Sequence, residues 1–478
     1  MTIAIQRDKS EFLYLQVVAM IRQMRKSNTL RPGDRLPSLR GLSEKLAVSI
    51  PTIKQAYAEL ERQGVITAKP KSGYFLKPAQ QVVVQPKRSR LAENPITVNR
   101  QSLIEQVFDA IHRPGVVSLG LANPASARSS DKALARLMRQ MVGKAGVKAV
   151  SYGPMNGYPP LKQKLALRYL ELGLQVDAQE LIVTNGAQEA LSIALQCVAK
   201  PGDIIAVESP VYFGILELIE SLGMLMLEIP LCPDDGIWVE DLERGIAEHS
   251  IKACLFSASI SNPLGSFMNQ AKQRQIVELL EKHDIPLIED DVYGDLYFTE
   301  QRGSTAQLFS KKGLVMTCSS FSKTAAPGYR VGWLLPGKFG DQAKRFKRAL
   351  SCASPTLSQW VLSEYIANGE YDRNTQLLRQ TLLLNKQRMI AAVTEAFPAE
   401  TRVSDPKGAG VLWIELPAGN ESVAFFHSAL QHNVSIAPGA LFSPSNKFNH
   451  CIRLSYGIEW TREIDSAIKT IGGLCKIS

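Results

Sequence analysis

The chain has 478 residues, 45% of them hydrophobic, which is enough for at least two domains with sizeable cores. Its seven cysteines are scattered, without a Cys-x-x-Cys pair or nearby histidines, so a disulfide framework and a zinc module are both excluded. No apolar run reaches the roughly 20 residues of a membrane span, and the polar N-terminus does not match a signal peptide, so a cytoplasmic protein is expected.

The net charge of +10 is unevenly distributed along the chain. Residues 1–90 hold 17 Lys and Arg against 6 Asp and Glu, a net charge of +11. The remaining residues hold 38 against 39, a net charge of −1. An imbalance confined to one end predicts that this end of the chain binds a polyanion.

Three helices are predicted in the basic segment. Apolar residues recur at helical spacing over residues 12–27. Ser38 is a natural N-cap for a second helix near 39–46, and Ser49 is one for a third helix that carries Ile53, Tyr57 and Leu60 inward. Helices in this order are typical of a helix-turn-helix, whose second motif helix enters the major groove of DNA.

Two short strands, 65–68 and 74–76, then flank the basic turn Lys-Pro-Lys-Ser-Gly. With this hairpin, residues 1–78 resemble the GntR-type winged helix DNA-binding domain over nearly their whole length, including a Pro-Gly-x-x-Leu-Pro-Ser-x-Arg turn. One departure is Ser49-Ile50-Pro51, where many relatives have Ser-Arg, so one expected DNA contact is missing. The resemblance implies DNA contacts from Arg35, Ser38 and Arg40, from Thr52, Lys54 and Gln55 in the groove, and from Lys71 and Gly73 at the wing tip.

Residues 79–102 are predicted to be a linker, because they are polar and basic and lack helical periodicity. Their length predicts that the domains on either side move separately. Residues 103–478 then form the second domain.

Apolar runs that alternate with helical stretches are the main feature of the second domain. Alternation of this kind is typical of a mostly parallel sheet with helices on both faces, which makes the chain a multidomain α/β protein. Function is then expected at the carboxyl ends of the strands. The runs predicted as strands are 181–184, 204–207, 253–257, 286–289 and 314–317.

Polar motifs follow the first three of these strands. The run Asn185-Gly186-Ala187-Gln188 joins a strand to a helix, and small residues at a helix N-terminus let backbone N–H groups approach an anion. Tyr212 follows the second strand, and Asn262-Pro263-Leu264-Gly265 follows the third. Each of these motifs alone is also an ordinary turn.

The fourth strand leads into Glu289-Asp290-Asp291-Val292-Tyr293. Three adjacent carboxylates at the end of an apolar strand are costly unless a cation meets one of them. A protonated pyridine nitrogen would serve, because a carboxylate partner keeps it protonated. A metal ion is the alternative, which is weaker because no histidine or further acidic cluster stands nearby in the sequence.

The fifth strand leads into the most informative stretch, residues 318–333. Here Lys323 stands among small hydroxylated and apolar residues, with Ser320 and Ser322 before it and Arg330 seven places after it. Partial burial beside a fixed cation lowers the pKa of an amine, as condensation with an aldehyde requires. The hydroxyls and the guanidinium suit a phosphate. Penicillin-binding proteins also carry Ser-x-x-Lys, but no Ser-Asp-Asn or Lys-Thr-Gly follows in this chain.

In this order the motifs resemble those of the fold-type I pyridoxal-phosphate (PLP) enzymes, the aspartate-aminotransferase superfamily. The resemblance implies PLP held as an aldimine on Lys323, and a mostly parallel sheet domain with a smaller C-terminal α+β subdomain. It implies Asp290 as the partner of the pyridine nitrogen. Tyr293 and Asn262 would bond the ring hydroxyl, and Tyr212 would stack on the ring. The implied phosphate ligands are Gly186, Ala187, Gln188, Ser320, Ser322, Arg330 and, from the neighbouring subunit, Tyr152.

The same resemblance assigns two more residues. Arg453, in Cys451-Ile452-Arg453-Leu454-Ser455-Tyr456, would grip the α-carboxylate of a substrate or effector, although a salt-bridged arginine on an edge strand is the alternative. Asp291 would be structural.

The winged helix, the linker and the aminotransferase-like domain together resemble the MocR-type regulators across nearly the whole chain. The resemblance implies a homodimer with shared active sites and a double-stranded DNA operator made of two half-sites. It also implies a response to PLP or to an amino-compound effector, which requires that the effector bind two states of the dimer unequally.

Two other functions stay open. An active PLP-dependent aminotransferase that carries a DNA-binding domain would use Lys323, Asp290 and Arg453 for turnover. A DNA-binding protein with a decayed, empty pocket is disfavoured because those three residues are intact.

Overall fold

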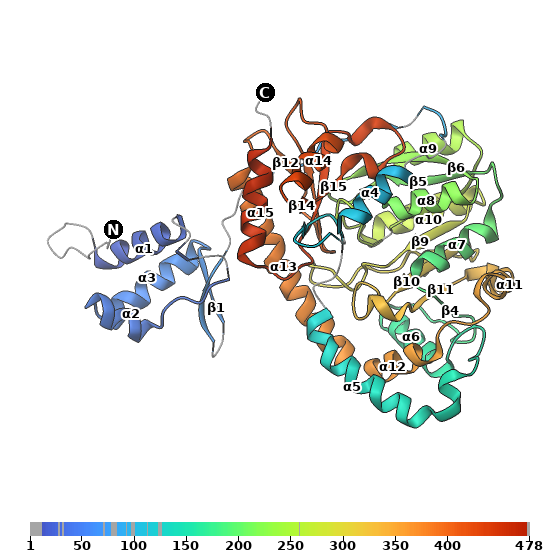
Figure 1. The fold of residues 1–478 in the computed structure, drawn as a ribbon, viewed down its shortest axis with the longest axis horizontal. Helices are drawn as coiled ribbons and strands as arrows, with labels where there is room; N and C mark the ends of the chain where they lie inside the picture. The colour runs from blue at the N-terminus through green and yellow to red at the C-terminus, as the bar shows by residue number, and fades with distance from the viewer. Residues whose placement is uncertain are drawn as a thin grey trace. The chain divides into compact units, whose positions relative to one another are not determined.

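A computed structural model of the chain shows two compact units that divide near residue 82 (Figure 1). The structure describes residues 12–26, 29–30, 33–69, 72–77, 84–91, 93–96, 101–111, 113–122, 127–257 and 259–475. Among these residues, no helix is both long and apolar enough to cross a membrane.

The N-terminal unit has the predicted three helices and hairpin. Their bounds are α1 Leu13–Lys26, α2 Leu39–Leu46, α3 Ile50–Arg62, β1 Ile66–Lys69 and β2 Gly73–Leu76, with β1 and β2 antiparallel. Both predicted caps are confirmed: the hydroxyl of Ser38 accepts from the N–H of Gly41 at 3.1 Å, and that of Ser49 accepts from the N–H of Thr52 at 3.4 Å. The core between the helices is fully buried at Ile53, Tyr57 and Leu60, as their spacing predicted.

The larger unit is built on an eight-stranded sheet. Its strand order is β4-β11-β10-β9-β8-β5-β6-β7, and only β11 and β7 run antiparallel to their neighbours. All five runs predicted as strands are strands of this sheet, whereas β6, β7 and β11 were not predicted. The bounds are β4 Ile182–Thr184, β5 Ile204–Ser209, β6 Leu225–Cys232, β7 Gly236–Ile237, β8 Ile251–Phe256, β9 Leu287–Asp290, β10 Val315–Ser320 and β11 Gly332–Leu335.

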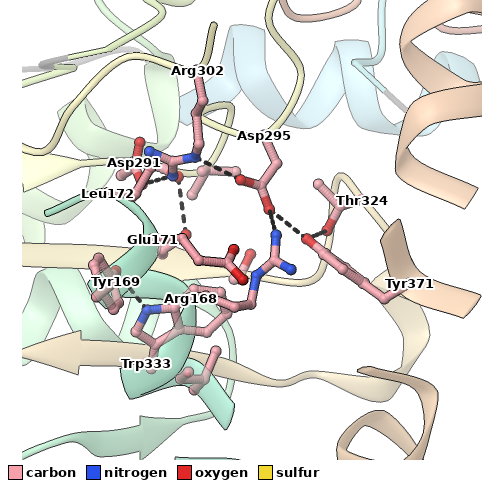
Figure 2. A pocket seen from close by; sticks show the side chains of 14 residues that line it. Arg168, Tyr169, Glu171, Leu172, Asp291, Asp295, Arg302, Thr324, Trp333 and Tyr371 are labelled. Atoms are coloured by element: carbon pink, nitrogen blue, oxygen red, sulfur yellow. Dashed lines mark hydrogen bonds and ion pairs between the residues drawn. The ribbon is translucent and has the colours of Figure 1, made fainter. Parts of the chain in front are cut away.

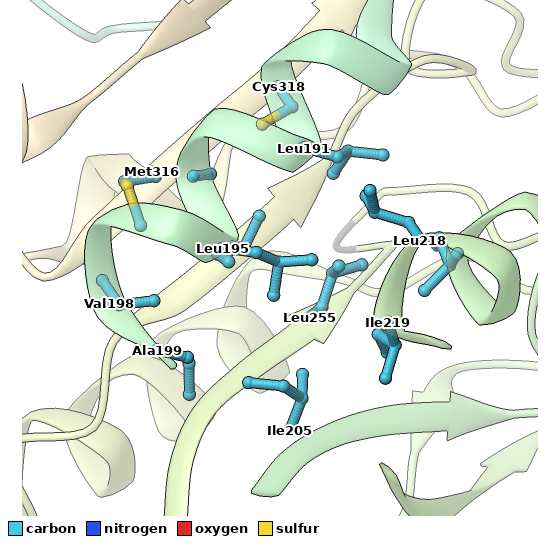
Figure 3. Close-up of a cluster of buried hydrophobic side chains, with 14 of the residues drawn as sticks. Leu191, Leu195, Val198, Ala199, Ile205, Leu218, Ile219, Leu255, Met316 and Cys318 are labelled. Atoms are coloured by element: carbon cyan, nitrogen blue, oxygen red, sulfur yellow. The ribbon is translucent and has the colours of Figure 1, made fainter. Parts of the chain in front are cut away.

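Successive residues of a strand point to opposite faces of the sheet, so these apolar strands present apolar side chains on both faces. Helices cover both faces. Ile182 packs into the core under α7 and α8, while Leu181 and Val183 pack on the opposite face with α6 and α12. Figure 3 shows the first of these cores, in which Leu191 and Leu195 of α7 lie over the strands. The helices that cover the sheet are α5 Ala127–Ala145, α6 Pro159–Glu171, α7 Ala187–Val198, α8 Phe213–Ser221, α9 Val239–Glu248, α10 Gln270–Lys282, α11 Gly340–Ser351 and α12 Thr356–Ala367.

A second, four-stranded sheet of order β12-β13-β16-β15 forms the smaller C-terminal subdomain. Beside this sheet, strand β3 Val117–Ser118 pairs with β14 Val434–Ser435. The start of the larger unit therefore packs against its C-terminal part. The other elements are β12 Arg402–Val403, β13 Val411–Glu415, β15 Ala437–Pro438, β16 Cys451–Ser455, α4 Gln101–Ile111, α13 Glu370–Ala396, α14 Ser422–Gln431 and α15 Arg462–Gly473.

Part of the predicted linker lies against the larger unit. The N–H of Val403 donates to the carbonyl of Val84 at 3.0 Å, in the C-terminal subdomain. Four residues on, the guanidinium of Arg88 meets the buried carboxylate of Asp241 at 2.5 Å and covers the ring of Trp238 at 4.1 Å. Residues 84–91 of the predicted linker therefore contact both the C-terminal subdomain and the α9 side of the large sheet, contacts that its polar, basic composition did not indicate.

Candidate functional site

A cavity opens where the parallel strands of the large sheet end, with about 1010 Å³ of empty space when the adjoining open solvent is included. Strands β9 and β10, the N-terminus of α7 and strand β16 all deliver side chains to it. Eleven of the residues predicted to hold the cofactor or its ligand line this one cavity: Ala187, Gln188, Tyr212, Asn262, Asp290, Tyr293, Ser320, Ser322, Lys323, Arg330 and Arg453.

Lys323 follows β10 and points into the cavity, where its amine donates to the carbonyl of Ala122 at 2.8 Å. Burial and the neighbouring charge of Arg453 lower the pKa of this amine to about 8, against the opposing effect of Asp290. A lysine with this pKa holds a sizeable neutral fraction near physiological pH, which is what attack on an aldehyde needs.

We therefore expect covalent capture of PLP by the apoprotein to accelerate as the pH rises, with a midpoint near the Lys323 pKa of about 8. Absorbance followed after rapid mixing, from about pH 6 to about pH 10, measures this midpoint. In Arg453→Gln the midpoint should move upward, because the nearby cation that lowers the pKa is gone. A wild-type midpoint close to the ordinary lysine value of about 10.4 would contradict the assignment.

Asp290 and Tyr293 lie at the end of β9. The pKa of Asp290 is raised to about 6, mainly by burial and also by the adjacent Asp291, whereas an N–H from Val292 at 3.1 Å and the amine of Lys323 oppose the shift. The hydroxyl of Tyr293 is buried and has no hydrogen-bond partner among the described residues. A buried carboxylate and an unpaired hydroxyl are costly in an apoprotein, and a protonated ring nitrogen and a ring hydroxyl would satisfy both.

Arg453 lies on β16, which is paired on one side with β13 and on the other with β15. It is therefore on an interior strand, and none of the carboxylates among the described residues forms an ion pair with it, so the alternative of a salt-bridged edge arginine is wrong. Its guanidinium donates to the side-chain oxygen of Asn262 at 3.1 Å and to the carbonyl of Gly120 at 2.5 Å. Its Nε is buried and has no hydrogen-bond partner in the described parts of the chain, and burial lowers the pKa of the guanidinium to about 10.

A buried arginine with an unsatisfied N–H is well suited to a carboxylate, which would restore the lost solvation. The contact with Arg453 also fixes the orientation of the Asn262 amide. Because the oxygen of Asn262 accepts from Arg453, its amide nitrogen is directed to donate elsewhere, as a bond to the ring oxygen of the cofactor requires.

The other end of the cavity is suited to a phosphate. Gly186 has a φ of +89°, and a Cβ there would lie 2.4 Å from the guanidinium of Arg330, so only glycine allows this close approach. Arg330 donates to the carbonyl of Asn185 at 3.0 Å, beside the N-terminus of α7. The side chain of Gln188 donates to the carbonyl of Gly214 at 2.6 Å, so its backbone N–H is the group available to an anion.

Two predicted cofactor residues do not line the cavity: Gly186, which lies next to Arg330, and Tyr152. The side chain of Tyr152 is 90% exposed, and it does not line the cavity of its own chain. Its predicted contact is with the cofactor of a neighbouring subunit, which stays a prediction.

Several cavity residues were not predicted from the sequence. Phe213 directly follows Tyr212, and this position next to a predicted residue is what could have identified it in the sequence. Phe108 and Ala122 come from segments more than 150 residues before Lys323, and no motif marks them. Ser257, at the end of β8, is held by the buried carboxylate of Glu208, which accepts from its hydroxyl at 2.8 Å.

A second, smaller cavity, with about 510 Å³ of empty space when the adjoining open solvent is included, shares Val292 and Ser320 with the first. Figure 2 shows the ion pairs in it: Asp295 meets Arg168 at 3.1 Å and Arg302 at 2.6 Å, and these two cations hold its pKa far below the usual range against the effect of burial. The hydroxyl of Tyr371 donates to Asp295 at 2.7 Å and accepts from the hydroxyl of Thr324 at 3.0 Å. Through Thr324, which directly follows Lys323, this network holds the backbone next to the predicted cofactor lysine.

Asp291 belongs to the same network, since it meets Arg302 at 2.5 Å and accepts from the hydroxyl of Ser259 at 2.8 Å. These contacts agree with the predicted structural role of Asp291, and they leave Asp290 as the carboxylate of the pair that faces the first cavity.

The residues predicted to contact DNA lie on α2, α3 and the hairpin of the N-terminal unit. Arg35, Arg40, Lys54 and Gln55 are exposed, and Gly73 begins β2 with a φ of +101°. The hydroxyl of Ser38 is used as the cap of α2, and that of Thr52 lies 2.8 Å from that of Ser49. Lys71 lies outside the described residues.

Two family descriptions match the chain. Aminotransferase class I and II matches residues 115–471, and the bacterial regulatory proteins of the gntR family match residues 13–76. Two proteins of Escherichia coli, described as the uncharacterized HTH-type transcriptional regulators YjiR and YdcR, are each 33% identical to the chain; each match covers 96% of this chain and 98% of the relative.

Among solved structures, the α-aminoadipate aminotransferase LysN of Thermus thermophilus, in complex with N-(5'-phosphopyridoxyl)-L-leucine, superposes with a TM-score of 0.70. It is 23% identical, and the match covers 79% of this chain and 98% of that one, which shows a shared fold. Together the comparisons confirm the predicted domain combination and fold class, and the aminotransferase match supports PLP as the cofactor.

Proposed function

The chain belongs to the aminotransferase class I and II family and carries a gntR-type regulatory domain, and on this premise we propose that it is a DNA-binding transcriptional regulator with PLP bound to Lys323. An amino compound, or PLP itself, is the effector. The observation that carries the proposal is the convergence of eleven predicted side chains on one cavity in a chain that also has a winged helix.

PLP, when bound, would supply an electron sink and a reactive carbonyl carbon. The residues of this chain would divide the binding among them. Lys323 offers the amine, Asp290 the carboxylate for the ring nitrogen, and Tyr293 a hydroxyl for the ring oxygen. The N-terminus of α7 and Arg330 offer N–H groups to the phosphate, and Arg453 offers its guanidinium to the carboxylate of an amino acid.

In this proposal the protein acts as a homodimer in the cytoplasm. Large apolar side chains are exposed just before the predicted inter-subunit residue Tyr152: Val147 is 79% exposed and Val150 is 88% exposed. Such a cluster is costly in a monomer and would be covered by a second copy of the chain. Two winged helices would then meet two half-sites of one operator.

The bound part of the linker offers a physical connection between the effector and the DNA. Residues 84–88 contact β12 in the C-terminal subdomain and α9 beside the large sheet, and Arg453 belongs to the same C-terminal sheet. If an effector at Arg453 moves this subdomain, the chain that leads to the winged helix moves with it. The coupling requires the effector to bind the two arrangements unequally.

The proposal is tested by measuring the affinity for a DNA sequence that the protein itself selects from a random pool. We expect this affinity to change when PLP is removed and again when an amino acid is added to the PLP-loaded protein. An affinity that is the same in all three states would refute the regulatory part of the proposal.

An active aminotransferase is the second candidate function, and the intact set of Lys323, Asp290 and Arg453 favours it. Formation of the keto acid from an added amino acid over many turnovers, with a second keto acid present, would establish it. The two functions are compatible in one chain.

Lys54, exposed on α3, is expected to contact a DNA phosphate. Lys54→Ala should weaken binding to the selected DNA and reduce the slope of log affinity against log salt by about 0.9 for each bound winged helix, or about 1.8 for the homodimer on two half-sites. Lys338→Ala, an exposed lysine of the other unit, is the matched control and should leave the slope unchanged. If Lys54→Ala leaves the slope unchanged, Lys54 makes no phosphate contact.

A further inference from the structure

The charged residues that line the cofactor cavity are all engaged by the proposed function. They are Lys323, Asp290, Arg330 and Arg453, which serve the aldehyde, the ring nitrogen, the phosphate and the α-carboxylate. Among the described lining residues, no further cation or anion remains to pair with a charge on the side chain of an amino acid. The other lining side chains include Phe108, Leu121 and Phe213, which are apolar.

Phe108 and Phe213 belong to a cluster of aromatic rings beside Arg453, which also includes the buried Phe442 outside the cavity lining. The ring of Phe213 meets that of Phe108 edge to face at 5.9 Å and that of Phe442 at the same distance. The guanidinium of Arg453 lies 6.0 Å from the centre of the Phe213 ring and 4.9 Å from that of Phe442. An amino acid whose carboxylate is held by Arg453 therefore has its side chain next to aromatic carbon.

Phe108 is placed to be covered by a ligand. On the same helix α4, Ile104, Val107 and Ala110 are almost fully buried, whereas Phe108 lines the cavity and remains 38% exposed. A large aromatic side chain at the rim of a cavity gains free energy when an apolar group excludes water from it. Phe108, Leu121 and Phe213 are called the apolar wall below.

We propose that the amino compound recognised by this protein is an α-amino acid with a large uncharged side chain, aromatic before aliphatic, which packs against the apolar wall. This inference rests on the proposed function, because it takes PLP on Lys323 and the carboxylate on Arg453 as given. It adds the side-chain class, and it makes Phe108 a residue that determines specificity.

The test is an absorbance titration of the PLP-loaded, full-length protein with L-phenylalanine, L-leucine, L-alanine, L-glutamate and L-lysine. We expect L-phenylalanine to half-saturate the spectral change at a concentration at least about tenfold below that of L-glutamate or L-lysine, since burial of apolar groups in a pocket discriminates by this order. L-Alanine, which shares the α-amino and α-carboxylate groups but lacks the side chain, is the reference ligand.

Two variants of Phe108 sharpen the test. Phe108→Ala should raise the half-saturating concentration of L-phenylalanine about tenfold, because the contact with its side chain is lost. The half-saturating concentration of L-alanine, which lacks that side chain, should stay the same. Phe108→Arg should reverse the preference in favour of L-glutamate, since it adds the missing cation. The control is Leu350→Ala, because Leu350 is a half-exposed apolar residue on α11 outside the cavity lining. It should leave the binding of both amino acids unchanged. Circular dichroism checks the fold of each variant, and Phe108→Leu replaces Phe108→Ala if the latter unfolds.

The outcomes separate this inference from the proposed function. If amino acids change the spectrum but L-glutamate or L-lysine does so at lower concentration than L-phenylalanine, the side-chain class is wrong and the effector site stands. An equal loss of L-phenylalanine and L-alanine binding in Phe108→Ala would also overturn the role of Phe108. If no amino acid changes the spectrum of the PLP-loaded protein, the effector site itself is refuted.

Discussion

Lys323→Ala is expected to yield a protein without the visible absorbance band of bound PLP. The amine of Lys323 is buried, has a pKa lowered to about 8 and lies in the same cavity as Asp290 and Arg330, so its removal takes away the atom that would bond the cofactor. PLP added to the variant should pass through a desalting column unbound or bind only by its phosphate and ring contacts. Spectra and retained phosphate before and after desalting measure this loss.

The control for this variant is Lys338→Ala, which removes an exposed lysine of the same unit. It should keep the absorbance band at full height. Lys323→Ala should also keep the far-ultraviolet circular dichroism and the DNA binding of the winged helix, because Lys323 lies in the larger unit and lines its cavity without belonging to its apolar cores. A band of normal height in Lys323→Ala would remove Lys323 from its assigned role.

Arg453→Lys is expected to weaken the binding of amino acids to the PLP-loaded protein by about 100-fold. The guanidinium of Arg453 is fully buried and held by Asn262 and Gly120, which aligns its remaining N–H group for a carboxylate. A lysine keeps the charge but loses this planar geometry, and truncation of one partner of a buried charge pair costs about 3 kcal/mol. The spectral titration with L-phenylalanine measures the loss.

A matched ligand distinguishes a carboxylate contact from general damage to the cavity. Phenethylamine has the side chain and the amine of phenylalanine but no carboxylate, so its binding should be the same in wild type and Arg453→Lys. Equal losses for phenylalanine and phenethylamine would mean that Arg453 supports the cavity without contacting the ligand.

The chemistry of the site could be predicted from sequence because its residues follow strands in short motifs. The three carboxylates at the end of an apolar run indicated a cationic partner, and the neighbours of Lys323 indicated an amine of lowered pKa. The roles of Asp290 and Tyr293 came from the resemblance to the fold-type I PLP enzymes. The apolar wall could not be predicted, because Phe108 reaches the cavity only through the packing of α4, a contact that no spacing in the sequence encodes.

Some elements of the fold could likewise be predicted from the sequence, and others could not. The five apolar runs next to the site motifs were predicted as strands, whereas β6, an equally apolar run, was not, because a short buried run does not reveal whether it is a strand or a helix. The polar, basic composition of residues 84–91 predicted a linker. Their attachment depends on Asp241 and Trp238, which lie some 150 residues away and could not be paired with Arg88 from sequence.

The most direct test of the account is an absorbance spectrum of the purified protein, taken before and after treatment with borohydride and followed by mass spectrometry of the peptide that contains Lys323. The account predicts a visible band that bleaches, and a peptide whose mass is increased by that of the reduced cofactor. A protein that is colourless and stays colourless with added PLP would contradict it and leave only the winged helix as a functional site.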